Sequence, residues 1–162
     1  MLRFRHRSCL ARPSMRGAPV MARTRIFLID PNSALVEATC ALFAESDYVQ
    51  IVGAAADLNQ ALDRIALLRP DFVLIDFIQA DQTTFGLIRN LKAQPAAPHV
   101  IVMSIYDSPR YEQAARVAGA DGFISKVELV HCLEPLVASF APVPLPRSKR
   151  HTGSLHAFSS CA

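Results

Sequence analysis

The feature that most constrains the fold is a repeated alternation of short apolar runs with longer stretches whose apolar residues recur every three or four positions. The first pattern is typical of a buried strand and the second of an amphipathic helix. We expect strands near residues 25–29, 49–53, 72–75, 99–103 and 122–125, each followed by a helix. Near-continuous apolar strands that alternate with helices indicate a parallel sheet covered on both faces.

Residues with strong positional preferences mark several helix ends. Asp57, with Gln60 three residues later, forms a capping-box pattern at the start of one helix. Pro70 ends that helix near Arg69, because the residue before a proline avoids helical geometry. A later helix begins with Ser108 as N-cap and ends at Gly119. The other helices are expected near 33–45, 84–93 and 129–140.

Right-handed crossovers leave few ways to connect such a sheet. We expect an α/β domain of three layers, a doubly wound five-stranded parallel sheet in the flavodoxin-like order 2-1-3-4-5. Polar residues follow four of the strands, namely Asp30, Asp76, Ser104 and Lys126. Because parallel strands end at the same edge, the sheet brings two carboxylates, a hydroxyl and an ammonium together there.

Charge separates the two ends of the chain from its middle. Residues 1–21 hold five arginines and no acid, and residues 141–162 hold three basic residues and no acid. The rest carries 17 − 8 = 9 basic residues against 14 acids, a net charge of −5. We expect a basic disordered extension at 1–22, the folded domain at 23–140 and a proline-containing disordered tail at 141–162. Translation from Met21 is one hypothesis for the extension.

Several function classes are disfavoured by the sequence. No apolar run approaches the roughly 18 residues of a membrane-spanning helix, and the four scattered cysteines have no metal spacing. No DNA-reading motif is present. The segment Pro31–Ala34 is a poor loop for a flavin phosphate, and Ile78 stands where an aspartyl phosphatase needs a second acid. We therefore expect a cytoplasmic protein that is not an enzyme.

Four segments together resemble the receiver domain of bacterial two-component response regulators. They are Ile29-Asp30, the run 70–76 that ends in Asp76, Val102-Met103-Ser104, and the run 118–126, Ala-Gly-Ala-Asp-Gly-Phe-Ile-Ser-Lys. The resemblance covers about residues 24–139. It implies a CheY-like fold and a role in phosphorelay signalling.

The resemblance also implies roles for individual residues. Asp76 matches the phosphoacceptor, which attacks a phosphohistidine and becomes an aspartyl phosphate. Asp30, Asp76 and the main-chain carbonyl of Ile78 match the ligands of a Mg²⁺ ion, which offsets the charge of the phosphoryl group. Lys126 pairs with a phosphoryl oxygen as a point charge.

Two further residues match the switch of the family. The hydroxyl of Ser104 would bond another phosphoryl oxygen, and Phe123 matches the aromatic residue that rotates inward on activation. Both have a plainer interpretation, since Ser104 is also an ordinary residue for a strand end and buried aromatics usually serve packing.

The chain departs from the family pattern around the expected site. Pro31 stands where a second acid normally follows the first strand, so we expect Mg²⁺ to bind weakly; Asn32 offers only a neutral oxygen. Ala80 and Thr84 replace a proline and a glycine in the loop after Asp76. Ile105 replaces a small residue, and we expect its side chain to lean over the pocket and restrict water or a partner.

Two functions remain open on this sequence. The first is a stand-alone response regulator that takes a phosphoryl group on Asp76 from a sensor histidine kinase or a histidine phosphotransfer protein. The second is a pseudo-receiver that binds partners regardless of phosphate. In either case output is by contact with a downstream protein or by homodimerisation, without DNA or membrane binding. The resemblance assigns this contact to the fourth helix, fifth strand and fifth helix, including Tyr111, Arg116 and Val130.

Overall fold

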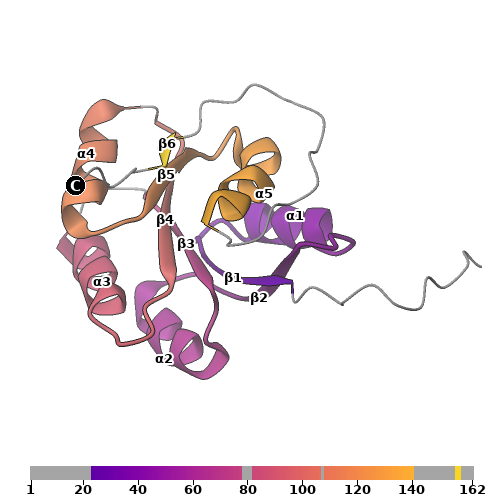
Figure 1. Cartoon of the computed structure of the whole chain (residues 1–162), viewed down its shortest axis with the longest axis horizontal. Coiled ribbons are helices and arrows are strands. Elements are labelled where there is room, and N and C mark those ends of the chain that lie inside the picture. Colours follow the sequence, from indigo (N-terminus) through magenta and orange to yellow (C-terminus); the bar gives the residue numbers. More distant parts are fainter. Residues whose placement is uncertain (1–22, 78–81, 107, 141–155, 158–162) are drawn as a thin grey trace, which may run out of the picture.

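The computed structural model describes residues 23–77, 82–106, 108–140 and 156–157. Its central sheet has the strand order β2-β1-β3-β4-β5-β6, and the first five strands are parallel (Figure 1). This confirms the predicted fold and the order 2-1-3-4-5. The parallel strands are β1 (Thr24–Ile29), β2 (Val49–Ala55), β3 (Phe72–Asp76), β4 (His99–Ser104) and β5 (Gly122–Ser125).

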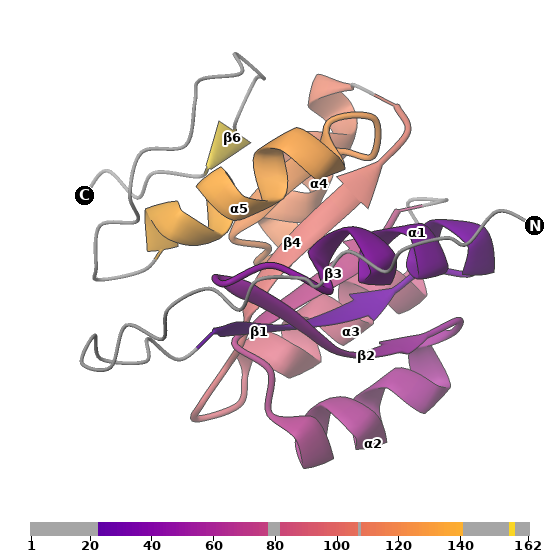
Figure 2. The same cartoon turned by 90° about the vertical axis from the view of Figure 1, so that its right-hand side faces the viewer.

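Five helices cover the two faces of the sheet, which makes three layers (Figure 2). One face packs against α1 and α5, and the other against α2, α3 and α4. No helix of the described residues is long and apolar enough to span a bilayer. The helices are α1 (Ser33–Phe43), α2 (Leu58–Leu68), α3 (Gln82–Lys92), α4 (Pro109–Ala118) and α5 (Leu129–Phe140).

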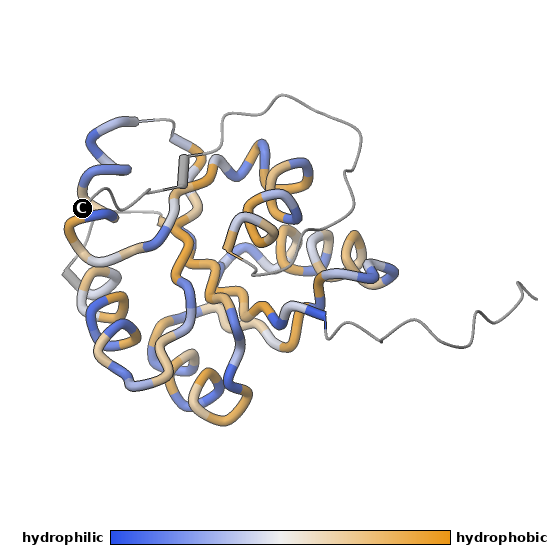
Figure 3. Tube along the Cα trace, in the orientation of Figure 1, coloured by the Kyte–Doolittle hydropathy of each residue, from blue (hydrophilic) through white to orange (hydrophobic). Residues whose placement is uncertain are grey.

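The core has two halves because successive strand residues point to opposite faces. In β3, Val73 and Ile75 pack beneath α2, α3 and α4, while Phe72 and Leu74 pack beneath α1 and α5. All four side chains are buried. The strands accordingly form the hydrophobic centre of the molecule in Figure 3. Because both faces of the sheet are buried, polar side chains of the strands are left to the strand ends and to the outermost strands.

Most of the predicted helix ends are present. Asp57 caps α2, since its Oδ1 accepts hydrogen bonds from the main-chain N–H groups of Asn59 and Gln60. Gln60 donates its side-chain amide to Asp57 Oδ2 at 2.7 Å, rather than to the Asp57 main chain as in a capping box. At the end of α2, Arg69 adopts a left-handed conformation with φ 46° just before Pro70.

The fourth helix also begins and ends where expected. Ser108 is its N-cap residue by position, although the side chain makes no capping hydrogen bond. Gly119 ends it with φ 101°, a conformation that costs glycine little. Elsewhere the bounds differ by about two residues: α1 ends at Phe43, α3 begins at Gln82, and β2 continues to Ala55.

The sheet has a sixth strand that the sequence did not predict. His156–Ala157 form β6, which pairs antiparallel with β5 in the register Gly122↔Ala157 and Phe123↔His156. The expectation of a wholly disordered tail is therefore wrong for these two residues. Residues 1–22, and the other residues of the tail, lie outside the described part of the chain.

Candidate functional site

The carboxyl edge of the sheet brings the predicted site residues together. Asp30 directly follows β1, Asp76 is the last residue of β3, and Lys126 directly follows β5. Because β1 and β3 are parallel neighbours with Ile29 opposite Ile75, the two carboxylates leave the sheet side by side. The apolar residues that precede each acid therefore place them both.

Lys126 bridges the two acids. Its Nζ lies 2.7 Å from Oδ2 of Asp30 and 2.7 Å from Oδ2 of Asp76. The Asp30 side chain is fully buried, and those of Asp76 and Lys126 are 5% and 11% exposed. One ammonium thus faces two desolvated carboxylates, which leaves an excess negative charge inside the site.

The orientation of Asp30 is fixed by the loop that follows it. Its Oδ1 accepts a hydrogen bond from the main-chain N–H of Asn32 at 2.8 Å. Its Oδ2 is buried and has no hydrogen-bond partner in the described part of the chain, although the Lys126 ammonium lies 2.7 Å away. The amide oxygen of Asn32 caps α1 by accepting from the N–H of Leu35 at 3.2 Å. The side-chain oxygen of Asn32 therefore serves as the N-cap of α1.

The electrostatics of the site act mainly on Asp76. Burial raises the pKa of its carboxyl above the ordinary value, and the neighbouring charge of Asp30 raises this pKa further. The hydrogen bond and charge of Lys126, together with the main-chain N–H of Phe77, oppose this rise. Because burial is the largest of these effects, the charged form of Asp76 is disfavoured, and added positive charge nearby would favour it.

Ser104 lies at the end of β4, between the strands that carry Asp76 and Lys126. It is fully buried, and its hydroxyl oxygen accepts a hydrogen bond from the N–H of Tyr106 at 3.0 Å. Its main-chain carbonyl accepts the N–H of Lys126 at 2.8 Å. Ser104 is thus at the predicted edge, and its hydroxyl proton can still be donated to a ligand oxygen.

The remaining sequence-predicted residues are placed less directly. Phe123 is 5% exposed and packs in the core half beneath α2, α3 and α4, so it serves packing here, and its switching role stays a prediction. Ile105 is 62% exposed, and its effect on the pocket likewise stays a prediction. Thr84 is buried in α3. Ile78 and Ala80 lie outside the described residues.

An aromatic cluster beside the site was missed by the sequence reasoning. Phe77, immediately after Asp76, is 2% exposed and packs against Phe85 of α3 and Tyr111 of α4, at ring-centroid distances of 5.6 and 5.5 Å. Tyr106 lies 6.2 Å from Tyr111. Tyr111 and Val130 were both assigned to the output surface. Tyr111 is half-buried and packs partly against this aromatic cluster, whereas Val130 is exposed.

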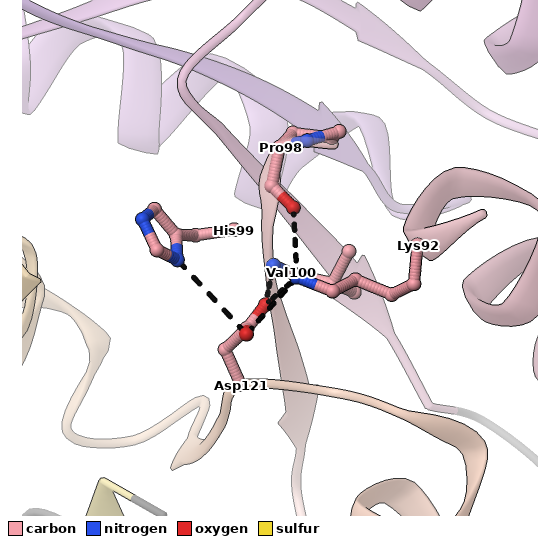
Figure 4. A network of polar contacts seen from close by, with 5 residues as sticks. All are labelled: Lys92, Pro98, His99, Val100 and Asp121. Atoms are coloured by element: carbon pink, nitrogen blue, oxygen red, sulfur yellow. Dashed lines mark hydrogen bonds and ion pairs between the residues drawn. The ribbon is translucent and has the colours of Figure 1, made fainter. Parts of the chain in front are cut away.

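A second polar cluster lies at the opposite end of β4 and β5 (Figure 4). Asp121 accepts hydrogen bonds from the N–H of Val100 and, with both carboxylate oxygens, from Lys92 of α3 at 2.9 and 3.0 Å. The N–H of Asp121 donates to the carbonyl of Val100. These contacts fix the position of Asp121, which directly precedes β5. They therefore also help to position Lys126, which directly follows β5.

The acids at the site offer oxygen ligands to a divalent cation. In the described part of the chain, no group of three or more His, Cys, Asp or Glu side chains could hold a metal ion. Asp30 and Asp76 supply hard carboxylate oxygens of the kind that Mg²⁺ binds, and Asp30 Oδ2 is buried without a hydrogen bond. The described residues thus fit Mg²⁺ in kind, through the carboxylates of Asp30 and Asp76.

Comparison with known proteins gives one consistent match. A family model described as the response regulator receiver domain matches residues 26–134. Two curated relatives are protein-glutamate methylesterase/protein-glutamine glutaminase 5 of Myxococcus xanthus, 27% identical over 108 residues, and the DNA-binding transcriptional activator DevR/DosR of Mycobacterium tuberculosis, 24% identical over 102 residues. These alignments cover 66% and 63% of this chain, but only 31% and 47% of the relatives.

Solved structures show the same fold. A response regulator from Thermotoga maritima superposes with a TM-score of 0.64 and 19% identity, covering 73% of this chain and 97% of that one. The signal receiver domain of the response regulator NarL from Mycobacterium tuberculosis superposes with a TM-score of 0.60 and 24% identity, covering 68% and 93%.

Proposed function

The chain belongs to the response regulator receiver family, and from that membership we propose that it accepts a phosphoryl group on Asp76 and signals by protein contact. The observation that carries the proposal is the buried arrangement in which Lys126 contacts both Asp76 and Asp30. A carboxylate with an adjacent acid and a shared lysine has the groups that phosphoryl transfer needs.

The proposed reaction is a single transfer. An oxygen of Asp76 attacks the phosphorus of a phosphohistidine, the new O–P bond forms, and the P–N bond breaks. The histidine leaves with the bonding electron pair and takes up a proton as imidazole. The product is an aspartyl phosphate on Asp76, which is lost again by hydrolysis to the free carboxylate and inorganic phosphate.

The residues around Asp76 have separate tasks in this reaction. Lys126 already lies 2.7 Å from Asp76 Oδ2, so its ammonium can follow the negative charge from the carboxylate to a phosphoryl oxygen. Ser104, buried on the intervening strand, can donate its hydroxyl proton to another phosphoryl oxygen. Once Asp76 is converted to the acyl phosphate, Asp30 becomes the principal acid paired with Lys126.

We propose Mg²⁺ as the cofactor, held by Asp30, Asp76 and the main-chain carbonyl of Ile78. Bound there, it supplies positive charge against the anionic donor. Pro31 stands where a second acid would follow β1, and Asn32 caps α1, so among the described residues the site holds the carboxylates of Asp30 and Asp76. Weak Mg²⁺ binding is therefore part of the proposal.

A second candidate function has its own support. Pro31 directly follows Asp30, so no second acid stands at that position and a Mg²⁺ ion would be held less firmly. This arrangement favours a pseudo-receiver, which binds partners through the face made by α4, β5 and α5 without phosphorylation. Exposed apolar side chains on and near that face, Val117, Val127 and Val130, suit protein contact in either function.

The two functions are separated by a phosphorylation assay. The full chain is incubated with Mg²⁺ and acetyl phosphate, and intact mass is used to find an adduct that survives acid but not base. The proposal expects this adduct, and expects Asp76→Asn to abolish it. Asp121→Asn is the matched control, because Asp121 also pairs with a lysine but lies at the other end of β5. No adduct at saturating Mg²⁺, and none from a histidine kinase, would favour the pseudo-receiver.

A further inference from the structure

The sixth strand changes what the edge of the sheet presents. Without β6, the described part of β5 would leave one side of its main chain unpaired, and such an edge attracts strands from other molecules. His156–Ala157 instead pair antiparallel with Gly122 and Phe123. Figure 1 places β6 beside β5, with α4 to its left and α5 to its right.

We propose that the edge of β5 is a strand-binding surface and that the chain's own C-terminal segment, His156–Ala157, occupies it. The occupancy withholds this edge from an extended strand of a second protein, and a partner gains it by displacing β6. Main-chain hydrogen bonds give such strand addition its affinity. The inference goes beyond phosphoryl transfer and does not depend on whether Asp76 is phosphorylated.

The position of β6 makes this segment relevant to protein contact. It pairs with β5, the central element of the face made by α4, β5 and α5. Large apolar side chains of that region are exposed, with Val117 of α4 at 78% and Val130 of α5 at 50%. A partner that lies across both helices would therefore meet the β5 edge between them.

Charge and tethering both favour the chain's own segment as the occupant. Residues 141–162 carry Arg147, Lys149 and Arg150 without an acid, whereas residues 22–140 carry a net charge of −5. Opposite charges draw the tail toward the domain. The tail also follows α5 directly, which raises its local concentration at β5 above that of a separate strand.

The first test measures hydrogen exchange of the β5 amides in the full chain. Proline has no N–H and disfavours strand pairing, so the double variant His156→Pro/Ala157→Pro releases β6. The proposal expects the amides of peptides spanning residues 120–126 to exchange at least about tenfold faster in this variant, because an unpaired edge opens at little cost. Ser148→Pro, in the same tail but outside β6, is the matched control. Equal exchange in all three proteins would overturn the proposal.

The dependence of β5 protection on protein concentration shows whether the bound segment His156–Ala157 belongs to the same chain or to a second copy. If β6 binds within its own chain, protection of the β5 amides in the wild-type protein is unchanged on dilution. Protection that fades on dilution would mean that the tail of another copy occupies the edge, and would overturn the proposal as stated. An unchanged urea midpoint for the proline variants shows that the domain itself remains folded.

A second test measures binding to the released edge. A fluorescent peptide of residues 150–162 is expected to bind the double proline variant at least about tenfold more tightly than the wild-type chain, whose edge is already filled. A scrambled peptide is expected to bind neither protein. A peptide that binds both proteins equally, or neither, would contradict an occupied strand-binding edge.

Discussion

Lys126 and Asp76 form an ion pair across the carboxyl edge of the sheet, with Nζ 2.7 Å from Oδ2, although β4 lies between their strands. The side chain of Lys126 therefore reaches past the end of β4, where Ser104 is buried. The same Nζ contacts Asp30 at 2.7 Å. A single lysine thus connects the ends of three strands, and its removal affects all of them.

We expect Lys126→Met to destabilise the protein by about 3 kcal/mol, because it leaves two buried carboxylates without their cation. The measurement is urea unfolding at neutral pH in Mg²⁺-free buffer. Adding Asp76→Asn to the variant removes one of the two unpaired buried charges, and is expected to restore about 1 kcal/mol or more through their coupling. Additive effects of the two substitutions would contradict a shared charge network.

Lys92→Met is the matched control for this prediction. Lys92 also pairs with an aspartate, Asp121 at 2.9 Å, but the two side chains are 28% and 23% exposed. Solvent weakens such a pair, so the expected loss is about 1 kcal/mol. An equal loss for both variants would show that the burial of the Lys126 site has little energetic weight.

The stability of the protein should depend on pH through Asp76. Burial raises the pKa of this carboxyl in the folded state above its ordinary value of 3.8. The folded protein then binds the proton more tightly than the unfolded chain, so this group's contribution to stability falls as the pH rises from 3.8 through the folded pKa. Above the folded pKa the contribution is constant.

Asp76→Asn removes the titrating carboxyl, so the difference in stability between this variant and the wild-type protein measures its contribution. We expect the variant to be more stable than the wild-type protein at neutral pH without Mg²⁺, with a difference that shrinks as the pH falls toward about 4. The measurement is the free energy of unfolding in urea across this range. A difference that grows on acidification would mean that the folded-state pKa is lowered, contrary to the burial of the site.

The parallel sheet and the positions of two acids at its strand ends were predictable because their signals are local. An apolar run followed by an acid identifies Asp30 and Asp76 as strand-end residues, and parallel order then makes them neighbours. Capping residues likewise act within one turn, so Asp57 and Gly119 mark helix ends correctly.

Contacts that depend on distant pairing were not predictable. Nothing near Lys92 shows that it meets Asp121, which follows it by 29 residues. The strand at His156–Ala157 pairs with β5 through main-chain hydrogen bonds at the edge of the sheet. Main-chain pairing of two residues leaves no apolar pattern in the sequence from which the strand could be predicted. Phe77 stands just beyond its strand, and its packing depends on Phe85 of α3 and Tyr111 of α4, which no local pattern around Phe77 indicates.

The tight contact between β1 and β2 gives a last prediction. Gly53 of β2 lies opposite Phe27 of β1, and an added Cβ would be 2.9 Å from both the Phe27 ring and Leu68. Phe27 is fully buried and Arg64 lies over its ring, which limits how far the ring can move. We expect Gly53→Ala to destabilise the protein by about 1 to 3 kcal/mol through overpacking.

Gly86→Ala is the control for Gly53→Ala, since it makes the same chemical change where there is space. Gly86 lies within α3, and apart from the adjoining backbone of its own helix an added Cβ would meet no heavy atom of the described residues within 4 Å. Alanine suits a helix interior better than glycine, so this variant is expected to gain about 0.5 to 1 kcal/mol. Urea unfolding of both variants measures the contrast. A neutral Gly53→Ala would show that Leu68 and Phe27 yield to the added methyl group, and that the β1–β2 contact is looser than its distances indicate.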